Sequence, residues 1–490
     1  MEGVTVGDVA RAVGGSLVGA PDLEAAAVRT AVVDSRKVTP GALFVALAGE
    51  RTDGHLYIEE ALKAGALACL IDRSKMNLWE AGWQAVGRPP ASAILVDDTL
   101  TALGDLGHWY KRRIGPVTVA VTGSNGKTTT KEMIAAILVE VGPTHRSSGN
   151  YNTEIGLPLT LLEMSLSHRF LVVEMGMRGA GQIRRLARLA EPLIGVVTNV
   201  GPVHLEILGS LDAIARAKQE LVEELPAGGV AVLNGDDPRV AAMAQGARGA
   251  AVLLYGLSPG CDVRAEKVDL KDGRSCEYRL VWSQGSGVDA TDGVVVKIPL
   301  PGRAAVWNSL AAAATALALG IPLEVVTGGL SRVAPPRQRL NIEELALGLT
   351  LIEDVYNASP ASMRVALETL AQVAVAAGGG RRVAVLGDMK ELGALSEEAH
   401  HELGHEVAAR GVDLLVTVGE LARLSGEVAL ADRASLEWRH CHDGEEAARE
   451  VPGLVRPGDV VLVKGSRAMA LETVVAALRG ERDRDGEVAN

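Results

Sequence analysis

The chain has 490 residues, 48% of them apolar and 22% charged, which is typical of a globular protein built from about three domains. Its formal net charge of −12 excludes broad electrostatic binding to nucleic acid or to an acidic membrane, but it permits a local basic pocket for an anionic small substrate. No apolar run is long enough to span a membrane and none resembles a signal peptide, so we expect a cytoplasmic protein without membrane insertion.

The first region, up to about residue 113, mixes short strands and helices. Residues 42–47 predict a buried strand, and residues 57–66 predict an amphipathic helix. A polar stretch then ends in Lys-Arg-Arg at 111–113, and a Gly-Pro pair breaks the chain before a strong strand pattern. We therefore predict a first domain over residues 1–113.

The second region alternates strand and helix patterns. Apolar strands are predicted at residues 117–121, 170–174, 194–200 and 230–233, and each is followed by a helical pattern. This alternation predicts a parallel sheet with helices on both faces. Short segments with Gly and Asp turns at about 253–300 predict a small antiparallel appendage, and an alanine-rich helix follows at 305–319. The Pro-Pro pair at 335–336 then ends a central domain over residues 114–334.

The third region, residues 335–490, interleaves helices with strands predicted at 349–352, 383–386, 414–418 and 460–463. It predicts a Rossmann-like α/β domain, so the fold class is α/β with three domains around a central P-loop sheet. Polar loops follow three of these strands. We expect this edge of the sheet and the equivalent edge of the central sheet to face each other across a cleft.

The strongest motif is Gly-Ser-Asn-Gly-Lys-Thr-Thr-Thr at residues 123–130, between a predicted strand and a predicted helix. Glycines let backbone N–H groups wrap phosphate oxygens, and the helix N-terminus adds positive potential. Lys127 can reach the terminal phosphates, and Thr128 is placed to bind Mg²⁺. The loop is shorter than G-x-x-x-x-G-K-[ST], because the first glycine of that pattern would fall at Val121. The sequence predicts binding of nucleotide phosphates here.

Two further side chains are predicted at the same edge of the central sheet. Glu174 ends the strand predicted at 170–174, where Mg²⁺ needs an oxygen ligand, although a solvated acid at a strand end is the ordinary alternative. His204 follows the strand predicted at 194–200. Taken alone it would be an ordinary loop histidine, and its position at this edge makes it a candidate.

Lys218 interrupts an apolar helix face formed by Leu211, Ile214, Leu221, Val222 and Leu225. The lysine could extend its amine to water along this face. Alternatively, its amine is partly buried, and is then easier to deprotonate and to modify.

Several short motifs occur in one order and together resemble the Mur ligases. They are T-G-S-N-G-K-T-T at 122–129, the strand ending in Glu174, G-P-V-H-L-E at 201–206, A-K-Q-E at 217–220, D-V-Y-N-A-S-P-A-S-M at 354–363, V-L-G-D-M-K-E-L-G at 385–393 and L-V-K-G-S-R at 462–467. The segments D-S-R-K at 34–37 and 41–55 are similar to the UDP-binding domain of this family. The resemblance covers the chain up to about residue 478.

The resemblance implies roles for individual residues. The nucleotide phosphates would be held by the loop residues Gly123, Ser124, Asn125, Gly126, Lys127, Thr128 and Thr129. The resemblance implies nucleotide contacts for Asn308, Arg339 and Asp354, and substrate contacts for Ser35, Arg36, Asn357 and Lys464. It implies Mg²⁺ ligation by Thr128, Glu174, His204 and a carbamylated Lys218, with catalytic roles for Lys127, Lys218 and His204.

The resemblance also implies an activity. Within the family the motifs are most similar to ligases that use ATP to join D-alanyl-D-alanine to UDP-N-acetylmuramoyl-tripeptide through an acyl phosphate, a step of peptidoglycan precursor synthesis. We expect a monomer, and both lysine and diaminopimelate stay open as the third residue of the tripeptide. The family usually has His-Asn at Ala304-Ala305 and often Asn at Thr153.

Three alternatives stay open from the sequence. Folylpolyglutamate synthetase typically lacks the N-terminal UDP domain and often has Gly-Ser where this chain has Thr128-Thr129. The ligase that adds the third peptide residue carries a D-N-P-R motif, which is absent here. A non-catalytic nucleotide-binding scaffold is disfavoured by the joint retention of Lys127, Glu174, His204 and Lys218.

Overall fold

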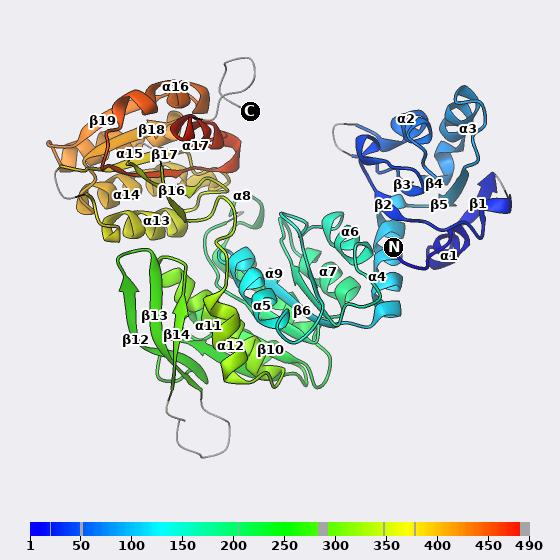
Figure 1. Cartoon of the computed structure of the whole chain (residues 1–490), viewed down its shortest axis with the longest axis horizontal. Coiled ribbons are helices and arrows are strands. Elements are labelled where there is room, and N and C mark those ends of the chain that lie inside the picture. The colour runs from blue at the N-terminus through cyan, green and yellow to red at the C-terminus, as the bar shows by residue number, and fades with distance from the viewer. Residues whose placement is uncertain are drawn as a thin grey trace.

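A computed structural model describes residues 1–19, 21–49, 52–203, 205–282, 293–345, 348–376 and 379–480. Within these residues the chain forms three sheets, each covered by helices, which confirms the predicted three-domain α/β fold (Figure 1). None of the helices described is long and apolar enough to cross a membrane.

The N-terminal sheet has the strand order β1–β5–β4–β3–β2, parallel except for β1. Its strands are β1 (Ser16–Gly19), β2 (Thr30–Val32), β3 (Ala42–Val45), β4 (Ala68–Asp72) and β5 (Ser92–Val96). Its helices are α1 (Val6–Ala12), η1 (Pro21–Leu23), η2 (Ser35–Lys37), η3 (Gly54–Tyr57), α2 (Ile58–Lys63), η4 (Arg73–Lys75), α3 (Met76–Ala85) and α4 (Thr99–Ile114). The strand and helix predicted in this region exist, but both are shorter than predicted.

Helix α4 joins the first domain to the second. The polar stretch that ends the first region is the second half of this helix, which stops at Ile114 because Gly115 adopts a left-handed φ of 68°. Leu106 and Tyr110 of α4 belong to the same buried cluster as Leu157 and Ile183 of the central domain. The N-terminal and central domains therefore share a hydrophobic core.

The central sheet has the strand order β14–β13–β12–β11–β10–β9–β6–β8–β7. Every neighbouring pair among strands β6 to β12 is parallel. Strands β12, β13 and β14 pair antiparallel and form the predicted appendage. The strands are β6 (Val117–Thr122), β7 (Thr144–Arg146), β8 (Phe170–Glu174), β9 (Ile194–Val197), β10 (Val230–Asn234), β11 (Ala251–Gly256), β12 (Val263–Lys271), β13 (Ser275–Trp282) and β14 (Val294–Ile298).

Helices cover both faces of this sheet. They are α5 (Lys127–Leu138), α6 (Gly156–Leu162), α7 (Gln182–Ala190), α8 (Leu205–Leu208), α9 (Leu211–Glu223), α10 (Pro238–Ala242), η5 (Met243–Gly246), α11 (Gly302–Ala318) and α12 (Leu323–Ser331). The alanine-rich α11 packs against α5 in one core cluster, while α6, α7 and α9 contribute to the core shared with α4. Small side chains on α11 permit this close helix packing.

The C-terminal sheet has the strand order β15–β16–β20–β17–β18–β19, and only β15 is antiparallel to its neighbour. The strands are β15 (Asn341–Glu344), β16 (Thr350–Asp354), β17 (Arg382–Gly387), β18 (Leu414–Val418), β19 (Glu437–Cys441) and β20 (Val460–Lys464). The helices are α13 (Pro360–Gln372), η6 (Gly393–Leu395), α14 (Ser396–Ala409), α15 (Glu420–Asp432), α16 (Gly444–Leu454), η7 (Arg467–Met469) and α17 (Glu472–Arg479). The predicted polar loops follow β16, β20 and β17, and the structure shows that these three strands are adjacent.

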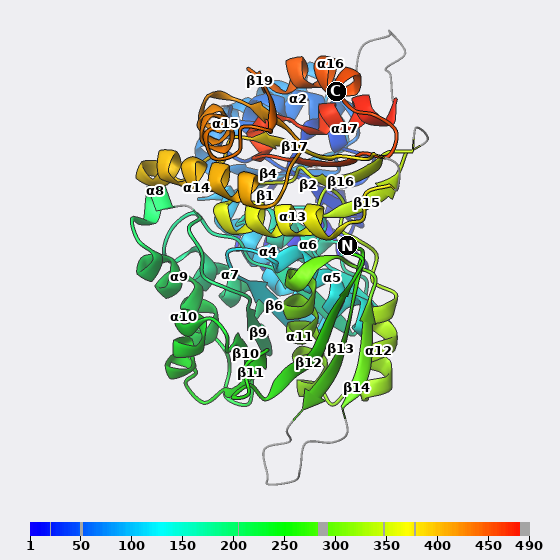
Figure 2. The same cartoon turned by 90° about the vertical axis from the view of Figure 1, so that its left-hand side faces the viewer.

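The C-terminal domain contacts the central domain through α13, which lies against α11 (Figures 1 and 2). Ser359, which caps α13, donates from Oγ to Asn125 Oδ1 of the phosphate loop over 3.3 Å. A second polar contact is the ion pair between Arg274 and Glu344. In the described ranges no buried hydrophobic cluster joins these two domains.

Candidate active site

The loop between β6 and α5 depends on two glycines. Gly123 has a φ of 146° and Gly126 has a φ of 82°, so both occupy conformations that other residues rarely adopt. A Cβ at Gly123 would lie 1.8 Å from Thr198 Oγ1, and one at Gly126 would lie 2.4 Å from Asn308 Oδ1. The predicted nucleotide residue Asn308 therefore lies directly against the start of α5, whose first turn carries Lys127, Thr128 and Thr129.

The segment after β9 braces this loop. The strand ends at Val197 rather than at residue 200 as predicted. The Thr198 N–H still donates to Thr122 O at the end of β6, but Asn199 and Gly201 bond to the phosphate loop. The Asn125 N–H donates to Asn199 Oδ1 over 2.9 Å, and Thr198 Oγ1 donates to Asn125 O over 2.6 Å. Ser124 Oγ accepts from the Gly201 N–H over 2.8 Å. These bonds fix the loop in one conformation.

The Lys127 side chain folds over the loop. Its Nζ donates to Gly123 O over 2.9 Å and to Ser124 O over 3.1 Å. Burial lowers the pKa of Lys127, the nearby Glu174 carboxylate opposes this shift, and the positive charge of Arg339 adds to it. Glu174 and Arg339 therefore both act on the loop lysine, the second from the C-terminal domain.

Side-chain oxygens that could bind a metal ion lie close to Lys127. Glu174, at the end of β8, is only 3% exposed, and its Oε2 accepts from Thr128 Oγ1 over 2.7 Å. Its Oε1 accepts from Asn152 Nδ2 over 2.8 Å, and its N–H donates to Ser147 Oγ over 3.2 Å. A buried carboxylate and a hydroxyl beside a phosphate loop are the hard oxygen donors that Mg²⁺ prefers, so these residues fit the ion.

Lys218 lies deep in the protein, on α9. It is 2% exposed, so the interpretation in which the lysine extends to solvent is wrong. Among the described residues its amine has no hydrogen-bond or ion-pair partner. Burial lowers the pKa of Lys218 well below the ordinary lysine value, and the positive charge of Lys127 lowers it further. The two lysines therefore lie within electrostatic range of each other. His204, the other predicted residue, lies outside the described residues.

The C-terminal domain contributes an aromatic and cationic cluster. The Arg339 guanidinium lies over the Tyr356 ring, 4.1 Å from its centroid, and the Arg467 guanidinium lies 5.6 Å from the same centroid. Because the charge of Arg339 also lowers the pKa of Lys127, this cluster is within electrostatic range of the phosphate loop. Tyr356 was not singled out from the sequence, although it is part of a quoted motif.

Two other predicted residues of this domain, Asp354 and Lys464, form a buried ion pair. Lys464 Nζ is bonded to Asp354 Oδ2 over 2.6 Å and to Asn357 O over 2.9 Å. Lys464 is 1% exposed, whereas Asn357 is exposed and accepts from the Ala358 N–H at 2.9 Å. The amine of Lys464 is thus occupied by protein partners and fixes the loop after β16.

Ser35 and Arg36 lie on η2 in the N-terminal domain. Ser35 Oγ donates to Glu60 Oε2 over 3.1 Å, and Arg36 donates to both carboxylate oxygens of Asp34 at 2.9 Å. The Arg36 side chain is 86% exposed. In the described part of the chain neither residue bonds to the phosphate loop, so the structure leaves them apart from the cluster around Lys127.

Asn152 and Asn199 were missed by sequence reasoning. Asn152 precedes Thr153, which differs from the family pattern, and Asn199 falls within the strand predicted at 194–200 but lies in a loop of the structure. Both are single polar residues in loops, so only their contacts to Glu174 and Asn125 reveal them.

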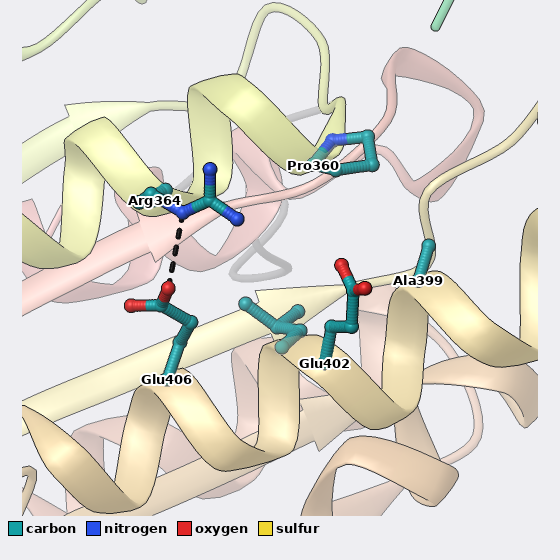
Figure 3. Close-up of a pocket in the computed structure, with 6 residues that line it drawn as sticks. Pro360, Arg364, Ala399, Glu402 and Glu406 are labelled. Carbon is teal, nitrogen blue, oxygen red and sulfur yellow. Dashed lines mark hydrogen bonds and ion pairs between the residues drawn. The ribbon is translucent and has the colours of Figure 1, made fainter.

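A small pocket lies elsewhere, between α13 and α14 (Figure 3). Arg364 Nε donates to Glu406 Oε1 across it over 3.0 Å. Its lining residues are Pro360, Arg364, Ala399, Glu402, Leu403 and Glu406. None of them belongs to the cluster around Lys127, so the candidate site is defined by polar contacts rather than by this pocket.

Comparison with known proteins matches most of the chain to one family. Residues 121–316 match the Mur ligase middle domain, residues 338–467 match the Mur ligase glutamate ligase domain, and residues 29–110 match the Mur ligase family catalytic domain. The chain is 37% identical over 476 residues to UDP-N-acetylmuramoyl-tripeptide–D-alanyl-D-alanine ligase of Bacillus subtilis, covering 97% of this chain and 98% of the relative.

Two solved structures are similar to this fold. A crystal structure of MurF from Acinetobacter baumannii has a TM-score of 0.83 and 31% identity, covering 97% of this chain and 98% of that one. MurF ligase from Thermotoga maritima, solved in complex with ADP, has a TM-score of 0.76 and 30% identity, covering 93% of this chain and 98% of that one. With its ordered motifs, its three domains and its phosphate loop, this chain belongs to the Mur ligase family.

Proposed function

We propose that this protein is the ligase that joins D-alanyl-D-alanine to UDP-N-acetylmuramoyl-tripeptide, using ATP and releasing ADP and phosphate. One observation carries the proposal: similarity along the whole chain to ligases of that name coincides with an intact loop around Lys127, Thr128 and Glu174. We also propose that it works as a monomer in the cytoplasm.

We assign a separate role in substrate binding to each domain. Residues 1–113 would hold the UDP-substrate, with Ser35 and Arg36 as contacts. Residues 114–334 would hold the ATP phosphates at Gly123–Thr129 and its base near Asn308. Residues 335–490 would close over the nucleotide with Arg339 and Asp354 and receive the dipeptide, with Asn357 beside it and Lys464 fixing that loop through its bond to Asp354.

The chemistry starts from a poor acyl donor. A carboxylate oxygen of the tripeptide attacks the γ-phosphorus, and ADP leaves. The amine of D-alanyl-D-alanine then attacks the acyl phosphate, and a C–N bond forms as phosphate leaves and the amine loses a proton. Lys127 would exchange its bonds to Gly123 O and Ser124 O for the transferring phosphoryl group, where its charge stabilises the developing negative charge.

Magnesium would be held by Thr128 and Glu174, and His204 stays a sequence-based candidate for the same role. When bound, the ion supplies charge neutralisation at the phosphoryl group. A cationic amine beside it would be repelled. We therefore propose that Lys218 is carbamylated by CO₂, which converts it into an anion with two acceptor oxygens. The burial of Lys218 without an anionic partner among the described residues supports this.

A ligation assay tests the function. The protein is incubated with ATP, D-alanyl-D-alanine and either the lysine or the diaminopimelate form of the UDP-tripeptide, and products are read by mass spectrometry. We expect a UDP-pentapeptide and phosphate release that needs both substrates. Phosphate release that needs a folate and glutamate instead would contradict the proposal and favour folylpolyglutamate synthetase.

A separate experiment tests the lysine modification. Labelled bicarbonate should give a carbamate carbon signal in the wild type and none in Lys218→Arg, because guanidinium stays protonated and cannot be carbamylated. Lys218→Arg should also lose most activity. Normal ligation by this variant would show that the carbamate is not required.

A further inference from the structure

Glu220 is a buried carboxylate that the proposed chemistry does not use. It lies on α9, two residues after Lys218, and is 6% exposed. Its Oε1 accepts from the Gly181 N–H over 2.7 Å, and its Oε2 accepts from the Arg184 N–H over 3.0 Å. Gly181 is the N-cap of α7 and has no side chain to cap this helix. Glu220 therefore caps α7 from a neighbouring helix.

The capped helix is directly connected to Glu174. The loop from Glu174 to Gly181 is held by Asn152, whose carbonyl accepts from the Gly176 N–H over 2.9 Å and whose side chain bonds to Glu174. Gln182 Oε1 accepts from the N–H groups of Arg178 and Gly179 at 2.6 and 3.0 Å. A continuous set of bonds thus runs from Glu174 through this loop to Glu220 on α9.

The geometry of α9 makes this bond a constraint on Lys218. Residues two positions apart on a helix are separated by about 200° of rotation and 3 Å of rise. Lys218 and Glu220 therefore lie on nearly opposite sides of α9, and both sides are buried. Because Glu220 bonds to two backbone N–H groups of one rigid helix end, it restricts both rotation and sliding of α9. Either movement would displace the Lys218 amine.

We propose that Glu220 is a positioning residue that holds Lys218 at a fixed place relative to Glu174. This inference rests on the proposed function, in which Lys218 carries a carbamate beside the metal ligands. In this arrangement the carboxylate touches neither nucleotide nor metal, and it acts only through α7 and α9. Its loss should therefore weaken the retention of the carbamate and of Mg²⁺ before it affects the fold.

Glu223 provides a matched control. It lies one turn further along α9 and also bonds to Arg184, but through the side chain, with Oε2 2.5 Å from Arg184 Nη2. It is more exposed than Glu220, and it bonds to no backbone group of α7 in the described structure. Glu223→Gln therefore removes a link between the same two helices without removing the cap.

The experiment compares Glu220→Gln and Glu223→Gln in the full-length protein. Carbamate formation at Lys218 is titrated with labelled bicarbonate by NMR, and the half-saturating Mg²⁺ concentration is measured in the ligation assay. We expect Glu220→Gln to raise the half-saturating concentrations of bicarbonate and of Mg²⁺ at least fivefold each. Glu223→Gln should change each by less than twofold. Glu220→Asp, which keeps the charge but shortens the reach, should give an intermediate shift and decides the outcome if Glu220→Gln does not fold.

Two outcomes overturn the inference and leave the proposed function intact. In one, Glu220→Gln, or Glu220→Asp in its place, folds and shows both values within twofold of the wild type, so Glu220 is a structural cap only. In the other, Glu223→Gln shifts both values as much as Glu220→Gln, so the effect reflects general loosening of α7 against α9. A wild-type protein without any carbamate signal would instead contradict the proposed modification of Lys218, and this inference with it.

Discussion

At the scale of single residues, the site is governed by which polar atoms already have protein partners. Lys127 is bonded to two loop carbonyls, and Glu174 is bonded to Thr128 and Asn152, whereas Lys218 has no partner among the described residues. The first two groups are therefore oriented by the protein itself. Lys218 is buried without a hydrogen-bond or ion-pair partner in the described structure. This costs free energy for a charged amine unless another group pairs with it or modifies it.

Lys127→Ala should abolish most turnover and leave the fold intact, because in the described structure the amine bonds only to carbonyls of its own loop. Removing a charge that stabilises a transferring phosphoryl group costs about 3–5 kcal/mol of barrier, or roughly 10²–10⁴ in kcat. The rate is measured by phosphate release, with the exposed Lys63→Ala as control. Near-wild-type ligation by folded Lys127→Ala would refute the role of the loop.

Asn152→Ala should weaken Mg²⁺ binding more than it weakens ATP binding. Its amide orients one oxygen of Glu174 without touching the nucleotide in the described structure, and partners of metal ligands typically change metal affinity about 10- to 100-fold. The half-saturating Mg²⁺ concentration should therefore rise about tenfold at saturating ATP. An unchanged Mg²⁺ dependence combined with a raised KM for ATP would show that Asn152 serves the nucleotide.

At the scale of elements, the edge strand β7 carries a pH-sensitive group. Burial lowers the pKa of His145 to about 4, helped by the neighbouring His168, while a bond to Thr160 O opposes the shift. Between pH 6.5 and 4 the unfolded chain binds a proton that the folded chain does not. Acid therefore favours unfolding, and the stabilisation is complete above pH 6.5 and lost as the pH falls toward 4.

His145→Gln should reduce this acid sensitivity. The shift corresponds to about 3 kcal/mol in total, of which about 2 kcal/mol is lost by pH 5. The free energy of unfolding is measured in urea at pH 7 and pH 5 for both proteins. The difference between the two pH values should be smaller in the variant by about 2 kcal/mol. Equal differences would mean that His145 is protonated in the folded protein.

The elements were largely predictable, because buried parallel strands give continuous apolar runs such as residues 170–174. The sequence also predicted Lys218 as an anomaly on an apolar face. It could not predict that β9 ends early, since that depends on bonds from residues 198–201 to the phosphate loop. The partners Asn152 and Glu220 were equally hidden, because they depend on which strands and helices become neighbours in space.

At the scale of the whole molecule, the two domain junctions differ in kind. The first is a shared hydrophobic core, reinforced by Tyr110, whose hydroxyl accepts from the Glu2 N–H over 2.8 Å and donates to Met164 O over 3.0 Å. The second, in the described ranges, includes polar contacts such as Ser359 with Asn125 and no common core cluster. The C-terminal domain is therefore the part expected to move as a unit.

Hydrogen exchange at increasing urea concentrations should resolve two unfolding units. Peptides from α4, α6 and β6 should lose protection together, and peptides from β16, β17 and β20 at a different concentration. Leu106→Ala, in the shared core, should destabilise α4 and α6 alike by about 2–5 kcal/mol and leave the C-terminal peptides unchanged. Loss of protection in α4 alone would show that the first domain is independent.

The shared core has a consequence for synthesis of the chain on the ribosome. The first domain emerges before Leu157, Ile183 and Leu221, which complete the core around α4. At roughly 5–20 residues per second, the apolar face of α4 stays uncovered for several seconds while these residues are translated. The first domain therefore cannot finish folding when its own sequence is complete. Chaperones that bind nascent apolar helices should engage this protein at α4 and release it once α6, α7 and α9 have emerged.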